Sequence, residues 1–435
     1  MSAGNDVWGD RAADGPPKPF FRSRWTPRPE HVRELDPTSA GLPAGFRAAG
    51  VACGIKPSGN TDLGILVCDA DSPVSAARFT ATATPAAPVL LSRERSRLDR
   101  LRAVLVNSGC ANAETGQRGL DDAAKTQGAT AIALGVEPEE IVLGSTGGIS
   151  WHLPVDAVLR GVLDASARLR REGDTDFQQA IQTTDAFEKR ASLAVDLPAG
   201  TVQISAQCKG AGMISPNFAT MLCFVQTDAK LEPHTADLLF GVCVKRSFDR
   251  CSVDGQLSTN DTAVLMCSGA SGVSVAPESE DELRFGEALD ALLRTLAIMM
   301  VADGEGAKRI ARVVVRGGHA EGVEAVARQL ANSPLVKTAL HSADPNWGRL
   351  VQAAGAGLAG HDWFPVPLAL DIAIENIQVC SAGAAIDYDA SALAASIQGH
   401  EIEYELTLPG SGWETEVFFS DLGHEYVTIN AEYTT

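Results

Sequence analysis

The sequence lacks long hydrophobic runs and tracts of positive charge. No stretch reaches the roughly 18 consecutive apolar residues that predict a membrane-spanning helix, so we expect none. The 435 residues carry a formal net charge of −19, and no Lys/Arg-rich run offsets it. Because a phosphate backbone or an anionic membrane attracts a basic surface, neither is expected as a partner. An acidic substrate would need a cation supplied at the binding site itself.

Targeting and disulfide signals are also missing. The N-terminus has no basic start followed by an apolar core, and its acidic residues disfavour a transit peptide. Nine cysteines are scattered without a CxxC pair, several of them inside apolar runs, where they are typical of small buried side chains. These features predict a protein of the reducing cytoplasm.

Several common catalytic motifs are absent. There is no GxxxxGK[ST], GxSxG or HExxH, and no histidine and cysteine spacing suits zinc. The segment GAGLAG (355–360) formally matches a dinucleotide fingerprint. However, NWGRLVQAA before it predicts a helix running into its glycine stop, whereas a dinucleotide site follows a strand. We therefore expect no bound nicotinamide.

Strand and helix patterns alternate along the rest of the chain. Residues 1–41 are rich in Pro, Arg, Asp and Gly and predict a poorly ordered extension, with a short helix over 29–35. Mixed strands and helices indicate an α/β or α+β fold with layered sheets. The expected elements are a hairpin over 45–71, a strand in 102–113, a helix over 119–136, a strand in 140–150, two strands across 191–210, a helix over 281–300 and a strand-rich end from 371 to 435.

Thr220 stands where a glycine-rich turn meets an apolar run, in KGAGMISPNFATMLCFV (209–225). A threonine hydroxyl is a weak nucleophile that needs a base, and its own α-amino group can serve if the residue begins a chain. Self-cleavage before Thr220 would create that amine, and the small Ala219 and the glycines upstream suit such a step. The same stretch also fits a simpler interpretation, in which a β-branched residue opens a strand.

This stretch resembles the hallmark of the ornithine acetyltransferase family, the ArgJ-like glutamate N-acetyltransferases of arginine biosynthesis. Further motifs of the family recur in order from about residue 42 to the C-terminus. They are GFRAAGVACGIKPSGNTDL, AAPVLLSRE, AVLVNSGCANAETG, STGGIS, TTD, SVDGQLSTNDT, DGEGA, DPNWGRL and INAEYTT.

The resemblance implies a role for each matching residue. Thr220 would be both the self-cleavage site, after Ala219, and the acyl nucleophile, while Thr146 and Gly147 would form the oxyanion hole. Lys209 and Glu305 would bind the substrate's carboxylate and ammonium. The remaining matches are Thr183 or Thr184, between which the sequence does not choose, the tail residues Asn430 and Thr435, and the pocket-wall candidates Asn260, Asp261 and Arg349.

The implied fold is a layered αββα-like sandwich with a smaller second domain, as in DmpA/ArgJ-like proteins. Residues 42–219 and 220–435 would form two fragments that stay associated and pair further. The implied reaction moves the acetyl group of N2-acetylornithine to L-glutamate through an acetyl-threonine ester. It needs no metal and no bound cofactor, although acetyl-CoA stays open as a second donor.

The sequence departs from the usual family pattern at a few positions. Cys110 replaces an asparagine, and Gly148 and Ser150 replace the Val and Gly of the family's STGVIG. Residues 79–89, FTATATPAAPV, lack the cations of the family's FTTNRVKAAPV. Other readings therefore stay open: a specialised acyltransferase, a self-cleaving amidase or aminopeptidase-type hydrolase, or an uncleaved, non-catalytic homologue.

Overall fold

The apolar run after residue 220 forms strand β9 (Leu222–Thr227), which is buried on both faces. The computed structural model describes residues 22–215 and 221–432. Leu222 and Phe224 lie in the apolar layer between two sheets. Cys223 and Val225 face the other way, into the layer beneath two helices. Because successive strand residues point to opposite faces, a continuous apolar run is what a doubly covered strand requires.

β9 lies near the middle of a six-stranded sheet of order β1-β7-β8-β9-β11-β4. β9 and β11 are parallel, and every other neighbouring pair is antiparallel. Strands from both sides of residue 220 therefore share this sheet. The remaining strands are β1 (Val32–Leu35), β4 (Val74–Phe79), β7 (Lys189–Leu197), β8 (Gly200–Lys209) and β11 (Thr262–Cys267).

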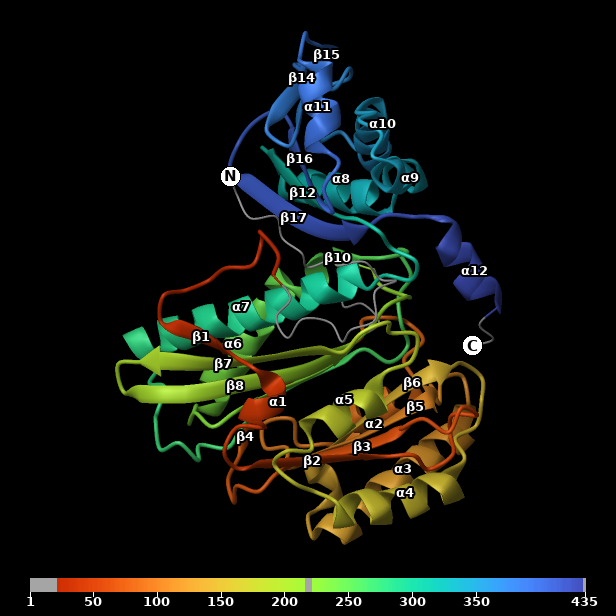
Figure 1. Ribbon diagram of the computed structural model, residues 1–435, viewed down its shortest axis with the longest axis vertical. Helices are drawn as coiled ribbons and strands as arrows, with labels where there is room; N and C mark the ends of the chain where they lie inside the picture. The colour runs from red at the N-terminus through yellow and green to blue at the C-terminus, as the bar shows by residue number, and fades with distance from the viewer. Residues whose placement is uncertain (1–21, 216–220, 433–435) are drawn as a thin grey trace.

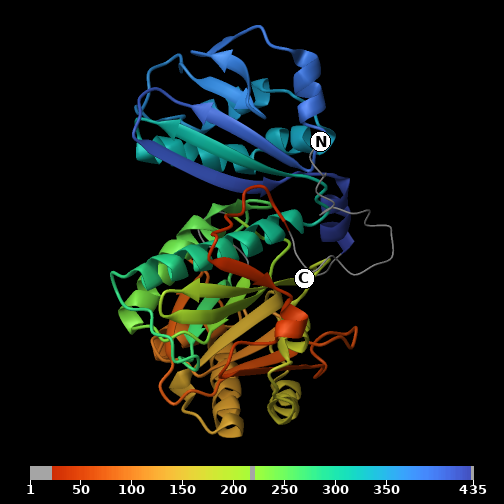
Figure 2. The same ribbon diagram turned by 60° about the vertical axis from the view of Figure 1, so that its left-hand side comes forward.

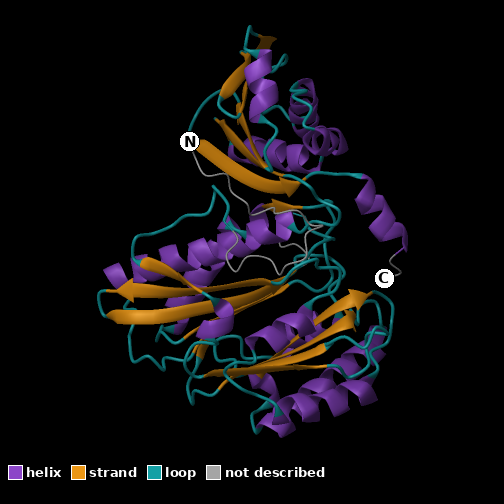
Figure 3. Cartoon of the chain, viewed as in Figure 1, coloured by secondary structure: helices purple, strands orange, loops and turns teal. Residues whose placement is uncertain are grey.

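A four-stranded sheet of order β2-β3-β5-β6 packs face to face against the first sheet. Helices α2, α3 and α4 cover its outer face, and α6 and α7 cover the outer face of the six-stranded sheet, which gives the layer order αββα (Figures 1 and 3). These elements are β2 (Phe46–Val51), β3 (Leu63–Cys68), β5 (Ala103–Cys110), β6 (Ile141–Gly148), α2 (Ala87–Arg95), α3 (Gly116–Leu134), α4 (Val155–Ala167), α6 (Pro233–Arg246) and α7 (Glu280–Ala302). Two shorter helices, α1 (Pro37–Ala40) and α5 (Asp174–Ile181), contact this body at β7 and β2.

A smaller unit with its own apolar core lies next to α7 (Figure 2). Its sheet has the order β10-β17-β12-β16-β13-β14-β15, and helices α8 to α11 cover one face. The strands are β10 (Cys251–Ser252), β12 (Ile310–Gly317), β13 (Asp371–Ile374), β14 (Ile377–Ser381), β15 (Ala384–Ala385), β16 (Glu401–Thr407) and β17 (Trp413–Ser420). The helices are α8 (Ala320–Asn332), α9 (Pro334–Ser342), α10 (Gly348–Gly357), α11 (Ala390–Ser396) and α12 (His424–Glu432), the last of which descends toward the larger body (Figure 1).

The layered αββα sandwich with a smaller second unit confirms the expected fold class. The long periodic segments also behave as predicted: β2 and β3 form an antiparallel hairpin, β7 and β8 form another, and α7 buries its leucine stripe. Gly355 and Gly357 lie within α10, as expected of a helix and not of a dinucleotide loop.

Two local predictions were wrong. Residues 22–41 are ordered, and the segment expected to be a short helix contains β1, which pairs antiparallel with β7. The free edge of β7 offers backbone hydrogen bonds that a helix this short does not outweigh in water. At the other end, the stretch predicted to be strand-rich holds β13 to β17, and residues 424–432 form α12. Residues 1–21 lie outside the described part of the chain.

No helix in residues 22–215 and 221–432 combines the length and the apolar character that crossing a membrane requires.

Candidate active site

Lys209 lies at the end of β8, where the two sheets of the sandwich meet. Its Nζ donates to Thr146 Oγ1 on β6 (3.1 Å) and to Thr183 Oγ1 in the turn after α5 (2.9 Å). The side chain is buried, and this burial lowers the pKa of Lys209, although the nearby Asp185 carboxylate works against the shift. Three segments that are distant in the sequence therefore meet at one ammonium group.

The predicted oxyanion pair lies at the end of β6. Thr146 is buried, and because its hydroxyl accepts from Lys209, its own proton stays free to be donated elsewhere. Gly147 has φ +128°, and a Cβ there would lie 2.4 Å from the carbonyl carbon of Gly109. The pairing of β5 with β6 shifts register at Gly109 and Cys110. Only glycine fits this backbone position.

A buried cluster of charged side chains lies next to Lys209, and the sequence motifs assigned no role to it. Lys189 Nζ lies 2.6 Å from Asp185 Oδ1 and 2.6 Å from Asp303 Oδ2, and all three side chains are fully buried. The Asp185 carboxylate also accepts from the backbone N–H of Gly210 (2.8 Å) and Thr183 (3.0 Å). Asp185 thus fixes the backbone on both sides of the Lys209–Thr183 contact.

The charges in this cluster are set by opposing effects. Burial alone would raise the pKa of Asp185, but the Lys189 and Lys209 ammonium groups outweigh it and hold that pKa below its usual range. Burial raises the pKa of Asp303, and Lys189 only partly offsets the rise. Asp185 is therefore the permanent carboxylate of the cluster. Asp185 and Lys189 are only four residues apart, but Asp185 lies in the loop before β7 and Lys189 begins that strand. Because they do not share a helix, no sequence pattern marked their contact or the approach of Asp303.

Glu305 lies against the glycine-rich turn that carries Lys209. Its backbone N–H donates to the Ala211 carbonyl (2.9 Å), and a Cβ on Gly212 would lie 2.6–2.7 Å from its carboxyl group. Asn430 on α12 donates through Nδ2 to Glu305 Oε2 (2.7 Å). The structure therefore brings a carboxylate, Glu305, with its partner Asn430, against the turn that carries the cation of Lys209. Such a pair can hold the carboxylate and the ammonium of an amino acid.

The remaining predicted residues divide into three groups. The Thr184 side chain has no hydrogen-bond partner within the described ranges, so the geometry favours Thr183. Asn260 and Asp261 are buried beside Met221, but Arg349 ties α10 to α9 through the Leu335 carbonyl (2.7 Å) and lies outside this cluster. The positions that lie outside the described residues are Ala219, Thr220 and Thr435.

The residues near the oxyanion pair that depart from the family pattern lie around Trp151. A Cβ on Gly148 would lie 2.7 Å from the Trp151 ring, so the ring packs directly on the glycine. Cys110 Sγ donates to the Trp151 carbonyl (3.3 Å), and Ser150 takes up φ +67°. Gly148 is therefore the residue that makes room for the tryptophan.

The comparisons with known proteins agree with these motifs. The ArgJ family matches residues 47–435. An arginine biosynthesis bifunctional protein ArgJ from Rhodopirellula baltica is 40% identical, covering 92% of this chain and 98% of that protein. Its counterpart from Caldanaerobacter subterraneus is 37% identical, covering 91% and 98%. An ornithine acetyltransferase from Mycobacterium tuberculosis, solved with ornithine, is 36% identical, covering 44% of this chain and 99% of that chain at a TM-score of 0.39.

The two-sheet sandwich, with a buried lysine beside a threonine–glycine oxyanion candidate, is typical of an enzyme that transfers acyl groups. The chain belongs to the ArgJ family.

Proposed function

We propose that this protein transfers the acetyl group of N2-acetylornithine to L-glutamate. It is an acetyltransferase of arginine biosynthesis, as its family membership supports. The observation that carries the assignment is the position of Lys209, whose Nζ contacts the hydroxyls of Thr146 and Thr183. A cation for a substrate carboxylate thus lies directly beside a donor for a developing oxyanion.

Thr220 is the proposed nucleophile. The chain cleaves itself between Ala219 and Thr220, and the new α-amino group, with a reference pKa of about 7.7–8.0, acts as the general base for the threonine hydroxyl. The hydroxyl attacks the acetyl carbonyl of N2-acetylornithine, ornithine leaves, and glutamate then attacks the threonine ester. The result is a ping-pong transfer with an acetyl-threonine intermediate.

The surrounding residues divide the binding and the charge stabilisation between them. The Thr146 hydroxyl and the Gly147 N–H stabilise the tetrahedral oxyanion. Lys209 binds the substrate carboxylate, Thr183 orients Lys209, and Glu305 binds the α-ammonium. Asn430 holds the Glu305 carboxylate, and Thr435 completes the tail of the site.

The assembly and setting follow from the same proposal. Fragments 1–219 and 220–435 stay associated because both supply strands to the six-stranded sheet, and the heterodimers pair further. The enzyme acts in the cytoplasm on small amino-acid substrates. The transfer uses no metal and no bound cofactor, and the same assay with acetyl-CoA in place of N2-acetylornithine tests a second donor.

The test combines intact-mass measurement of the purified protein with N-terminal sequencing and a transfer assay. We expect two fragments, one beginning Thr-Met-Leu, and formation of N-acetylglutamate only when N2-acetylornithine and glutamate are both present. Thr220→Ala should remain a single chain without activity. Acetate release that does not depend on glutamate would identify a hydrolase, and a wild-type chain that stays intact would overturn the proposed mechanism.

A further inference from the structure

The turn at residues 210–214, which precedes the proposed cleavage site in the sequence, is hydrogen-bonded to one short segment, residues 253–255. The Asp254 carboxylate accepts from the backbone N–H of Met213 through Oδ2 (2.6 Å) and of Ile214 through Oδ1 (2.9 Å). In return, the Ile214 carbonyl accepts from the N–H groups of Val253 (2.9 Å), Asp254 (3.3 Å) and Gly255 (3.2 Å). This reciprocal contact fixes the backbone at 213–214.

The rest of that turn is tied down as well. Gly210 N–H donates to Asp185 (2.8 Å), and the Ala211 carbonyl accepts from the Glu305 N–H (2.9 Å). Met213 has φ +59°, a left-handed conformation that is uncommon for a residue with a side chain. Tertiary contacts must therefore hold Met213 in place, and Asp254 supplies the one at its own N–H.

A second carboxylate from the same loop holds the chain on the other side of the proposed cleavage site. Asp261 Oδ1 accepts from the backbone N–H of Met221 (2.9 Å), and Asp261 is buried. Its Oδ2 has no hydrogen-bond partner among the described residues. Burial raises the pKa of Asp261 well above the usual range for a carboxyl group.

We propose that Asp254 and Asp261 are positioning residues for self-cleavage, one on each side of the Ala219–Thr220 bond. This inference rests on the self-cleavage assigned above and names the groups that align it. An intramolecular attack gains rate when its reacting atoms are held close in the right orientation. The 253–261 loop fixes residues 213–214 and residue 221, the described positions that precede and follow the bond in the sequence.

The two carboxylates should differ in how they tolerate an isosteric amide. Asp254 uses both oxygens to accept from backbone N–H groups, and an asparagine there would turn an NH2 group toward one of them. Asp261 uses a single oxygen for Met221, which an asparagine oxygen can replace. The pattern of asparagine and alanine effects therefore reports on these contacts and not on general stability.

The experiment follows cleavage of the full-length chain after pulse-labelled cell-free synthesis. Asp254→Asn, Asp254→Ala and Asp261→Ala are expected to slow the appearance of the fragments by about tenfold or more, and Asp261→Asn by less than about threefold. Asp389→Asn is the matched control, since Asp389 also accepts from two backbone N–H groups, of Ser391 and Ala392, but lies at the start of α11 in the second unit. The control should cleave at the wild-type rate.

Protease resistance and the melting temperature of each variant report whether it has folded. Cleavage of both Asp254 variants at the wild-type rate would overturn the inference, and so would a slowing that follows the loss of thermal stability across all five variants. If the wild-type chain does not cleave, the self-cleavage assigned under the proposed function is wrong. If the wild-type chain and all the variants cleave at the same rate, self-cleavage stands and only the positioning role is wrong.

Discussion

At the scale of single residues, Lys209 is held by hydroxyl groups and not by a carboxylate. Thr146 and Thr183 accept its hydrogen bonds, while the nearest acid, Asp185, is engaged by Lys189. Hydroxyl acceptors orient an ammonium group without neutralising its charge. The two hydroxyls thus leave the charge of Lys209 unneutralised, as the proposed role in binding a substrate carboxylate requires.

This geometry separates two adjacent threonines that the sequence did not distinguish. Thr183→Val removes the acceptor at 2.9 Å from Lys209 Nζ, and we expect kcat/KM for N2-acetylornithine to fall about tenfold or more, mainly through KM. Thr184→Val should lower it by less than about threefold. Steady-state kinetics of the two variants, with circular dichroism as a folding control, decide the matter. A larger loss for Thr184→Val would contradict the arrangement around Lys209.

Sequence motifs found most of the polar residues that meet at this site, but not the groups that support them. Lys209, Thr146 and Glu305 were each marked by a local motif, and the structure places them around one turn. Lys189 and Asp303 are separated by more than a hundred residues, and nothing in either neighbourhood encodes their contact at 2.6 Å. A single sequence carries local patterns well, whereas a long-range ion pair depends on how the sheets assemble.

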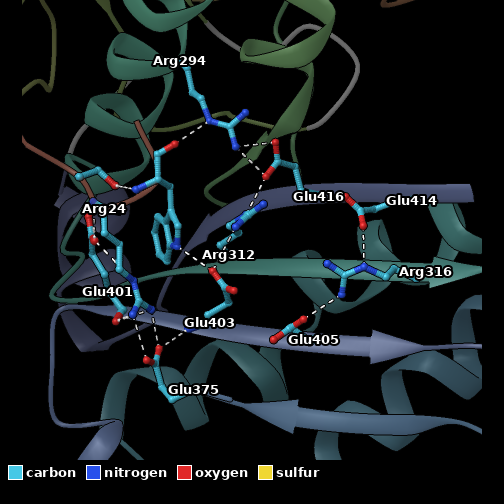
Figure 4. Close-up of polar contacts among 12 residues, drawn as sticks. Arg24, Arg294, Arg312, Arg316, Glu375, Glu401, Glu403, Glu405, Glu414 and Glu416 are labelled. Atoms are coloured by element: carbon cyan, nitrogen blue, oxygen red, sulfur yellow. Dashed lines mark hydrogen bonds and ion pairs between the residues drawn. The ribbon is translucent and has the colours of Figure 1, made fainter. Parts of the chain in front are cut away.

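At the scale of elements, the N-terminal segment joins the two units of the molecule. Trp25 packs against Phe418 of β17 (ring centroids 5.7 Å apart) and donates through Nε1 to Glu403 of β16 (2.9 Å). Arg294 of α7 donates to the Trp25 carbonyl (2.9 Å). It also donates to Glu416 (2.7 Å), a contact that Figure 4 shows. The segment therefore contacts both the large body and the sheet of the second unit.

The face of the second sheet that meets this segment is a ladder of arginines and glutamates. Arg312 pairs with Glu416 (2.6 Å) and Glu403 (3.2 Å), as Figure 4 shows. These side chains alternate along their strands with apolar residues of the second core. A row of alternating charges makes most of this sheet face polar, while Phe418 and Ile310 at its end pack with Trp25 in the apolar core of the large body. The remaining members of the ladder are Arg24, Arg316, Glu375, Glu401, Glu405 and Glu414.

Removal of that tryptophan should weaken the fold markedly. Trp25 is 7% exposed, and Trp25→Ala is expected to lower the free energy of unfolding by about 3–5 kcal/mol, because it leaves a cavity and removes the Nε1 donor to Glu403. Trp413→Ala on β17 is the matched control, since Trp413 is 56% exposed, and it should cost less than about 1 kcal/mol. Urea denaturation of both variants gives the comparison. Equal losses would show that the N-terminal segment contributes little.

Elements were predictable where their apolar period was long and failed where they were short. Helix α7 was predicted from four leucines at helical spacing, and β9 was predicted from an unbroken apolar run. By contrast, β1 has only four residues and exists because β7 offers a free edge. Helix α12 has no buried residue, so its pattern carries no period, and its position depends on contacts such as that of Asn430 with Glu305.

At the scale of the whole molecule, the end of β17 links the second unit to the loop that carries Glu305. Lys337 of α9 is buried and donates through Nζ to the backbone carbonyl of Ser420. The next residue, Asp421, contacts His341 Nδ1 (2.7 Å) and accepts from the backbone N–H of Lys308 (2.9 Å), three residues beyond Glu305. A buried lysine of the second unit is thereby connected, through Ser420 and Asp421, to the loop that carries Glu305.

The buried lysine should make folding stability depend on pH. Burial lowers the pKa of Lys337 to about 7, although Asp421 and Asp254 oppose the shift, whereas an unfolded lysine keeps a pKa near 10.4. Between these values the unfolded chain binds a proton that the folded chain does not, so the free energy of unfolding rises with pH. The slope approaches about 1.4 kcal/mol per pH unit for one proton. Below pH 7 both states are protonated, and the slope disappears.

Comparison with Lys337→Met isolates this contribution from all other titrating groups. The variant keeps a side chain of similar length without the charge, so the stability of the wild type relative to Lys337→Met should increase by roughly 2–3 kcal/mol between pH 7 and 9. Lys125→Met is the control, because the Lys125 side chain is 64% exposed on α3 and its change should leave the pH dependence as in the wild type. Denaturant unfolding at half-unit pH steps measures the difference. A constant gap between wild type and Lys337→Met across this range would mean that Lys337 stays protonated in the folded protein and that the carboxylates of Asp421 and Asp254 outweigh its burial.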